Sequence, residues 1–260
     1  MANYATVTVA RHDQVALVSL NRPDSLNAFN ASLRRDLLQA VQEVNADDSI
    51  RAVVLAGEGR AFCAGADLTE VAGDDFDVEK QLNTEYKPVL MAITDAPKPW
   101  ISAVNGAAAG VGSSFAMVCD LTVMAENAYI YQAFAAISLV PDGGATWHLA
   151  RTLGRKRAYE LIVSGEKLPA ARCLELGLCN RVVPAESLLA DTLQWAQELA
   201  GKAPLALRHA KAALNFAMEH GVDDVISEEA RLQALCIASA DAREGVTAFA
   251  EKRAPVWRGK

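Results

Sequence analysis

The segment AVVLAGEGRAFCAGADL, residues 52–68, joins two patterns that together indicate the fold class. Residues 52–56 are a continuous apolar run, which is typical of a short strand buried on both faces of a sheet. Residues 57–68 are rich in glycine and alanine, and such small side chains let a ligand touch the backbone. Tight turns and close packing of a strand against a helix explain the same composition equally well, so both interpretations stay open.

Strands and helices alternate around this segment. The first twenty residues alternate in the period of two and predict a β-hairpin, and apolar spacing predicts helices at 31–45 and 80–93. A strand is expected at 100–104, followed by a second glycine-rich loop. After about residue 145 the pattern becomes mainly helical; the expected helices include 145–153, 185–200, 204–220 and 225–238. We therefore expect an α/β core followed by a helical portion, with no Pro/Ser-rich linker between them.

Composition restricts the possible partners. The 260 residues include 25 basic and 32 acidic side chains, a formal charge of −7, which argues against a nucleic acid or an anionic membrane as partner. The charge-free stretch 99–119 is long enough to cross a bilayer, but its glycines, serines and proline would break a spanning helix. Five cysteines without a C-x-x-C pair and a beginning without a secretory signal indicate a reducing, cytoplasmic location.

The second loop, NGAAAGVGSS at residues 105–114, matches the first in character. Two such loops facing each other could hold a developing oxyanion between two backbone N–H groups. Neither loop contains a P-loop motif, and Gly110-Val111-Gly112 lacks the third glycine of a dinucleotide fingerprint. The acidic residues between 67 and 79 lack the spacing of an EF-hand, so we expect a solvated loop there and no metal site.

Four motifs carry a resemblance to a known family. GRAFCAGADL, NGAAAGVG leading into SSFAMVCDL, LVPDGGAT, and the terminal REGVTAFAEKRAPVWRGK resemble the crotonase (enoyl-CoA hydratase/isomerase) family, in that family's order and over essentially the whole chain. The resemblance implies a ββα spiral core, placed here at 1–200, and a C-terminal helical trimerisation region at 201–260. It also implies acyl-CoA thioester substrates, no separate cofactor, and a homotrimer or a dimer of trimers.

The resemblance assigns roles to individual positions. The two oxyanion amides fall on Ala64 and Val111, where valine replaces the usual glycine of the family. Lys252 matches a basic position that helps to bind the CoA phosphate, and the basic end of the chain around it agrees with that role. A solvated basic tail is the alternative. The segment expected to contact CoA consists of Gly65, Ala66, Asp67 and Leu68.

The acid–base group decides which reaction the family site can perform. The two glutamates of the family's hydratases correspond here to Ser114 and Phe134, and neither side chain can act as a carboxylate base. Phe134 is instead expected to line the substrate pocket. Asp142, in LVPDGGAT, is the remaining carboxylate, although an aspartate before a helix is often only an N-cap. The VPDGG turn and the C-terminal motif look like those of isomerases similar to 1,2-epoxyphenylacetyl-CoA isomerase of phenylacetate breakdown.

These residues lead to one main hypothesis and three alternatives. The main one is an acyl-CoA isomerase that shifts a double bond, with Asp142 moving the proton in a largely apolar pocket that raises its pKa. A related ring-type isomerisation would use the same groups. The alternatives are an atypical hydratase, an acyl-CoA hydrolase, and a family member that binds acyl-CoA without catalysis.

Overall fold

The structure is a computed structural model that describes residues 4–70 and 76–260. Of the acidic residues discussed above, Asp74 and Asp75 lie outside the described residues. Two sheets are present. The six-stranded sheet has the order β1 (Val7–His12), β2 (Val15–Leu20), β3 (Ala52–Gly57), β5 (Trp100–Val104), β7 (Leu121–Ala125) and β10 (Arg181–Val183). The four-stranded sheet has the order β4 (Ala61–Cys63), β6 (Ala107–Ala109), β8 (Tyr129–Tyr131) and β9 (Lys167–Pro169).

The two sheets advance together along the chain. Strands β3, β5 and β7 are parallel neighbours in the large sheet, and β4, β6 and β8 are parallel neighbours in the small sheet. Each of β3, β5 and β7 is therefore followed by a strand of the small sheet and then by helical structure. This is the ββα spiral that the sequence motifs predicted, and the predicted N-terminal hairpin is the antiparallel pair β1–β2.

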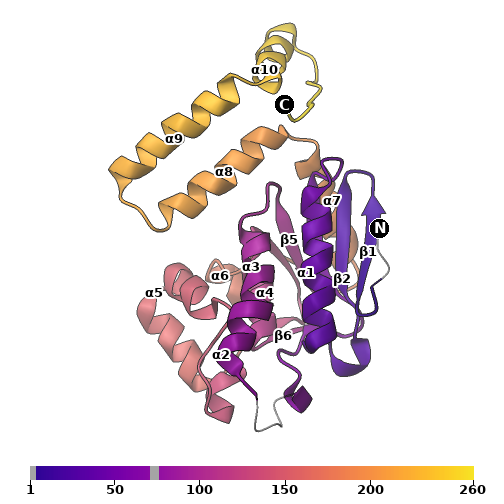
Figure 1. Ribbon diagram of the computed structural model, residues 1–260, viewed down its shortest axis with the longest axis vertical. Coiled ribbons are helices and arrows are strands. Elements are labelled where there is room, and N and C mark those ends of the chain that lie inside the picture. The colour runs from indigo at the N-terminus through magenta and orange to yellow at the C-terminus, as the bar shows by residue number, and fades with distance from the viewer. Residues whose placement is uncertain (1–3, 71–75) are drawn as a thin grey trace.

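Helices cover both faces of the large sheet. The longer helices of the core are α1 (Ala31–Ala46), α3 (Lys87–Thr94), α4 (Val111–Met117), α5 (Ala145–Ser164) and α7 (Leu188–Ala200); α6 (Ala170–Glu175) is shorter. Helix α7 packs across β2, β3 and β5, whereas α1 lies against β1 and β2 (Figure 1). Every residue of β2 is buried, as a strand covered on both faces requires.

The segment expected to form one helix at 80–93 is divided. It consists of α2 (Val78–Gln81), a π-helical turn at Leu82–Tyr86 and α3. Pro88 lies in the first turn of α3 and has no N–H to donate to the preceding turn, so a regular α-helix cannot continue through it. The wider turn places the buried Tyr86 against the core.

The C-terminal helices extend away from the core (Figure 1). They are α8 (Pro204–Ala217), α9 (Val222–Ile237) and α10 (Ala240–Glu251). Lys211 of α8 reaches back to the core, where its Nζ donates to the carbonyl oxygen of Ile93 and forms a 2.9 Å ion pair with Asp120. Asn215 donates to the carbonyl oxygen of Thr94, so α8 is fastened to the end of α3.

The charge-free stretch 99–119 folds into β5, β6 and α4, as a strand, a loop and a buried helix. All seven residues of α4 are buried. None of the helices in the described part of the chain combines the length and the apolar character that crossing a membrane requires.

Candidate active site

Two loops meet where β4 and β6 end. The strands are parallel, with Cys63 beside Ala108, so the residues that follow them emerge at the same edge of the small sheet. A Cβ atom on Gly65 would lie 3.0 Å from the carbonyl oxygen of Ala109 and 3.6 Å from Cα of Gly110. The φ of Gly65 is +104°, a value that side chains rarely adopt. Glycine at this position therefore lets the two loops touch, as their composition suggested.

The amides of these loops are not equally available. The Ala64 N–H donates to the carbonyl oxygen of Leu26 at 2.9 Å and is already used within the protein. The Phe29 N–H donates to the carbonyl oxygen of Gly65, and the Asp67 N–H donates to the carbonyl oxygen of Phe29. The N–H of Ala66, which lies between Gly65 and Asp67, takes no part in this bridge. Val111 begins α4, and the first N–H groups of a helix have no intrahelical acceptor. Among the described residues, neither the Ala66 nor the Val111 N–H has an acceptor.

The two available donors are therefore Ala66 and Val111. The hydrogen bond to Leu26 speaks against Ala64, the residue expected from the sequence, and Ala66 had been expected only to contact CoA. Nothing in the local sequence separates these two alanines. The choice depends on the segment 26–29, which pairs with the loop only in the folded chain.

Asp142 lies in a turn that packs against the start of α4. Gly143 has a φ of +58°, and a Cβ atom there would lie 2.9 Å from Cβ of Ser114 and 3.0 Å from Cγ2 of Val111. The Ser114 hydroxyl donates to the carbonyl oxygen of Asp142 at 2.9 Å. The turn that carries the carboxylate is thus held directly beside the second oxyanion loop.

The Asp142 carboxyl group is not a helix cap. The N-cap of α5 is Gly144, and this helix has no side-chain cap. Oδ1 of Asp142 is buried and has no hydrogen-bond partner within the described residues. Burial raises the pKa of Asp142 from 3.8 to about 6. Burial, with a smaller contribution from the Asp142 charge, also raises the pKa of Tyr86 above its usual range.

Ser114 and Phe134 lie beside this carboxylate turn and the second loop. Ser114 is fully buried, and its only side-chain hydrogen bond among the described residues is the one to Asp142. Phe134 is 6% exposed, and its Cζ would lie 3.9 Å from a Cβ atom on Gly110. The two positions that the resemblance assigns to hydratase glutamates are thus occupied by the Ser114 hydroxyl, which holds the backbone of Asp142, and by the phenyl ring of Phe134.

A cavity of about 660 Å³ begins at the residues that follow Asp142 and runs between α3, α5 and α8. His148 lines it, and burial followed by the charge of Arg151 lowers the pKa of this imidazole to about 4, so it is neutral near pH 7. The far wall carries the Lys211–Asp120 ion pair. The cavity has the size of a small-molecule site and adjoins the carboxylate.

The remaining expected contact residues fall in two places. Asp67 lies at the end of the first loop, where hydrogen bonds from Thr69 and Arg22 lower its pKa, and Leu68 beside it is exposed. Lys252 is exposed and ends α10, and Figure 1 shows α10 at the opposite end of the molecule from β6, which leads into the second loop. A contact between Lys252 and substrate therefore requires a second copy of the chain.

Cysteine chemistry is not a feature of this site. Cys63 adjoins the first loop, but it is buried, and its Sγ donates to the carbonyl oxygen of Asn27. Burial raises the pKa of the Cys63 thiol to about 12, so the reactive thiolate is not formed near neutral pH. All five cysteines are free thiols, and the other four also lack a role in the loops described.

The ββα spiral, the paired loops and their two unpartnered N–H groups define a protein of the crotonase fold. The enoyl-CoA hydratase/isomerase family model matches residues 10–260. A probable enoyl-CoA hydratase of Rhodobacter capsulatus is 38% identical over 99% of this chain and 100% of its own length. The 1,2-epoxyphenylacetyl-CoA isomerase of Escherichia coli is 38% identical over 95% of both chains. The crystal structure of an enoyl-CoA hydratase subunit from Geobacillus kaustophilus has a TM-score of 0.94, with 33% identity and complete coverage of both chains.

This chain belongs to the enoyl-CoA hydratase/isomerase family. The resemblance found in its motifs is confirmed, and so is the crotonase-like fold. The relatives include proteins named as hydratases and proteins named as isomerases. Family membership therefore does not decide between the two reactions, and the choice depends on the residues of the site.

Proposed function

We propose that this protein is an acyl-CoA isomerase that converts a 3-enoyl-CoA to a 2-enoyl-CoA or performs a related ring-type isomerisation. The observation that supports this most is Asp142, a buried carboxylate with an unpartnered oxygen and a raised pKa beside the second N–H loop. Ser114 and Phe134, at the two hydratase glutamate positions, supply no second base. One carboxylate is enough to take up a proton and return it elsewhere on the same molecule.

The proposed steps move one proton and keep the atom count unchanged. The Asp142 carboxylate removes the proton from C2 of the 3-enoyl thioester, and the electron pair moves into a dienolate whose charge develops on the thioester oxygen. The N–H groups of Ala66 and Val111 donate to that oxygen. The protonated Asp142 then returns the proton at C4, so that the double bond ends between C2 and C3.

The surroundings of Asp142 suit this sequence. A pKa of about 6 leaves the group mainly ionised near pH 7, yet close enough to neutrality for it to hold and release a proton. The buried ring of Phe134 takes the place of a group that could orient water. A protein that only binds acyl-CoA has no use for such a carboxylate. The ring-type variant is supported by the name of the Escherichia coli isomerase, and it would place the reaction in phenylacetate degradation.

The first test replaces Asp142 by Asn. A panel of 3-enoyl-, 2-enoyl- and aryl-CoA thioesters should show double-bond migration by the native protein and a loss of about 10²–10⁴-fold in D142N. Asp95→Asn, an exposed aspartate at the end of α3, is the matched control and should keep its activity. If D142N keeps most of the isomerisation rate, the proposal is wrong.

Product analysis distinguishes the alternative reactions. Mass spectrometry in deuterated solvent should show a product of unchanged composition apart from exchanged hydrogen. A product that has gained water would identify an atypical hydratase, and release of free CoA would identify a hydrolase. No turnover of any thioester, with CoA binding intact, would identify a binding protein.

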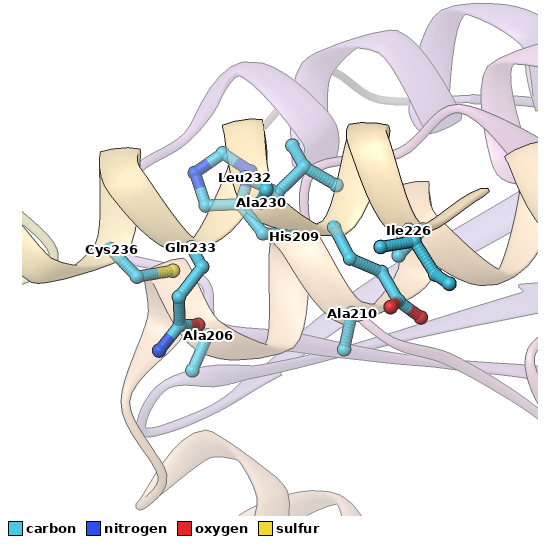
Figure 2. A pocket seen from close by; sticks show the side chains of 10 residues that line it. Ala206, His209, Ala210, Ile226, Ala230, Leu232, Gln233 and Cys236 are labelled. Carbon is cyan, nitrogen blue, oxygen red and sulfur yellow. The ribbon is translucent and has the colours of Figure 1, made fainter. Parts of the chain in front are cut away.

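The C-terminal helices support a homo-oligomer, which we propose to be a trimer or a dimer of trimers. Helix α8 has no buried residue and α9 has one, although both are amphipathic. Figure 2 shows the open cavity of about 710 Å³ between them, lined by small and apolar side chains such as Ala210, Ala230 and Ile226. On α10, Phe249 is 86% exposed. Apolar faces of this extent need a partner, and a second copy would also bring Lys252 to another subunit.

The proposal places this enzyme in the cytoplasm, because five free thiols agree with a reducing compartment.

A further inference from the structure

A third cavity, of about 380 Å³, opens at the opposite end of the large sheet from the oxyanion loops. Its walls include Ile50 and Arg51 before β3, Pro97–Pro99 before β5, and the junction of α7 with α8. The oxyanion loops follow the carboxyl ends of the same parallel strands. The five residues of β5 alone separate the two edges by about 16 Å. No lining residue is common to this cavity and the 660 Å³ cavity of the candidate active site, so the two are separate cavities.

Positive charge is concentrated in this cavity, which we call the basic cavity. Its lining includes six basic residues and one acidic residue, Asp48, although acidic residues outnumber basic ones in the chain. The six are Arg51, Lys98, Lys202, Arg208, Arg258 and Lys260. Such an accumulation on a chain of charge −7 is unfavourable without a counter-charge, because like charges at this distance repel.

Two of the basic residues belong to the wall. Lys98 is 6% exposed, and its Nζ donates to the carbonyl oxygens of Val44 and Asp47, each at 2.8 Å. Arg51 Nη2 donates to the carbonyl oxygen of Trp257 at 2.8 Å. These bonds connect the end of α1 and the C-terminal tail, so the wall is a fixed part of the fold.

A buried carboxylate holds the tail in place. Asp241 is 4% exposed, and its two oxygens accept the backbone N–H groups of Arg258 and Gly259 at 2.7 and 2.8 Å. The N–H groups of Ala240 and Asp241 donate in turn to the main-chain oxygen of Lys260. Fixing the tail backbone in this way presents Arg258 and Lys260 at the rim of the basic cavity.

Four cationic side chains of the basic cavity form no direct ion pair. In the described part of the chain, the side chains of Lys202, Arg208, Arg258 and Lys260 make no hydrogen bond and no ion pair. Asp48 also lines the cavity, where its charge acts on the wall residue Lys98, and the charge of Arg258 acts on Glu244. Asp47 and Glu244 are used mainly by other groups. Asp47 accepts hydrogen bonds from Ser49 and pairs with Arg11, and Glu244 is bound by Arg253.

Helix α8 adds to the attraction for an anion. It begins at Pro204, in the wall of the cavity, and Ala203 at its N-cap provides no side-chain acceptor. The N–H groups of Leu205 and Ala206 have no acceptor among the described residues. The positive end of the helix dipole thus lies in the same wall as the free cations.

The rest of the lining is apolar, with prolines and leucines such as Pro97, Pro99, Leu199 and Leu205. Clustered cations next to an apolar wall match a ligand that combines phosphate groups with a flat, weakly polar ring. The volume falls within the usual range of small-molecule sites, about 300–1,000 Å³. We propose that the basic cavity binds a nucleotide that carries two or more phosphate groups, at a site distinct from the acyl-CoA site.

The test measures binding rather than turnover, so its outcome does not depend on whether the isomerase proposal is correct. Isothermal titration calorimetry of the full-length protein with ADP should show binding, with inorganic pyrophosphate weaker and adenosine weaker still. The double variant K202E/R208E reverses two exposed charges and should weaken ADP binding at least tenfold. Lys156→Glu on α5, an exposed lysine outside the cavity, is the matched control and should leave the affinity unchanged.

The competing explanation is that ADP enters the acyl-CoA site, because CoA contains an adenine nucleotide. In that case K202E/R208E would bind ADP as the native protein does, and the proposal would be overturned. The same holds if neither ADP nor pyrophosphate binds. Equal affinities for ADP and pyrophosphate would overturn the assignment to a nucleotide. The KM for acyl-CoA should be the same in the double variant and the native protein, and circular dichroism should confirm that the variant is folded.

Discussion

In the proposed reaction, Asp142 combines a catalytic requirement with a cost to stability. Burial disfavours its ionised form, so the folded protein holds the proton up to about pH 6, whereas the unfolded chain releases it near pH 3.8. The proposed reaction needs the ionised form of Asp142, and this is the form that burial disfavours. Among the described residues no donor reaches Oδ1, so this oxygen is available to accept the proton in the proposed reaction.

A pH profile tests this account at the level of the residue. The value of kcat/KM for isomerisation should rise through a midpoint near pH 6 and level off above about pH 7, because only the ionised Asp142 removes a proton. A profile that falls only below pH 4 would show that this aspartate has an ordinary pKa.

The contribution of Asp142 to the free energy of unfolding should fall with rising pH, whereas kcat/KM should rise. Because the folded-state pKa is raised, Asp142 favours the folded state fully below about pH 4 and loses this contribution as the pH rises through about 6. D142N should therefore be more stable than the native protein at pH 7.5 by about 1–2 kcal/mol, with the difference much reduced near pH 4. Urea unfolding of both proteins at the two pH values measures it.

At the level of elements, the site depends on how the 141–144 turn sits against α4. Gly143 touches Val111 and Ser114, and Ser114 donates to the backbone of Asp142. The carboxylate and the second N–H donor are therefore positioned by the same first turn of one helix. The π-helical turn before α3 brings the buried Tyr86 close enough for the Asp142 charge to affect its pKa.

Ser114→Ala tests the contact between the helix and the turn. Loss of the hydroxyl should lower kcat by roughly tenfold with little change in KM, because the carboxylate loses its alignment while the binding loops stay intact. The stability cost should stay near 1 kcal/mol. Ser102→Ala is the matched control, since this buried serine also donates to a backbone carbonyl, at Ala116, but lies inside β5. Equal kcat in S114A and the native protein would contradict the positioning role.

At the level of the whole molecule, the helices α8–α10 are held to the core at few points. Lys211 and Asn215 connect α8 to the end of α3, and Arg51 connects the tail to the start of β3. Most apolar residues of these helices are exposed in one chain, including Val222 at 76% and Phe249 at 86%. These exposed apolar faces are the surface that the proposed oligomer would bury.

Phe249→Glu tests the oligomer. A charge in the centre of an apolar contact should dissociate the assembly, because an unpaired carboxylate would be buried there. Light scattering after size-exclusion chromatography should give a multiple of the chain mass for the native protein and a lower mass for F249E. Thr247→Glu on the polar side of α10 should leave the mass unchanged. A native monomer would contradict the proposal directly.

The sequence by itself predicted an α/β core, the N-terminal hairpin, the two glycine-rich loops and the helical C-terminal portion. These follow from local properties: the period of apolar residues, and glycine where backbones must touch, as at Gly65. The spiral order of the core and the two hydratase glutamate positions, Ser114 and Phe134, were implied by the resemblance of the motifs to a known family. Asp142 was singled out because the type of a side chain decides which proton chemistry it can perform.

Tertiary structure decided what depends on pairing between distant segments. Because the Ala64 N–H donates to the carbonyl oxygen of Leu26, the free N–H of the first loop belongs to Ala66 and not to Ala64. No local sequence pattern predicts that hydrogen bond. The raised pKa of Asp142 and the basic cavity formed by the tail, α8 and the amino ends of the sheet arise in the same way. Burial and charge clustering are properties of neighbours in space, and residues far apart in the chain become neighbours only when it folds.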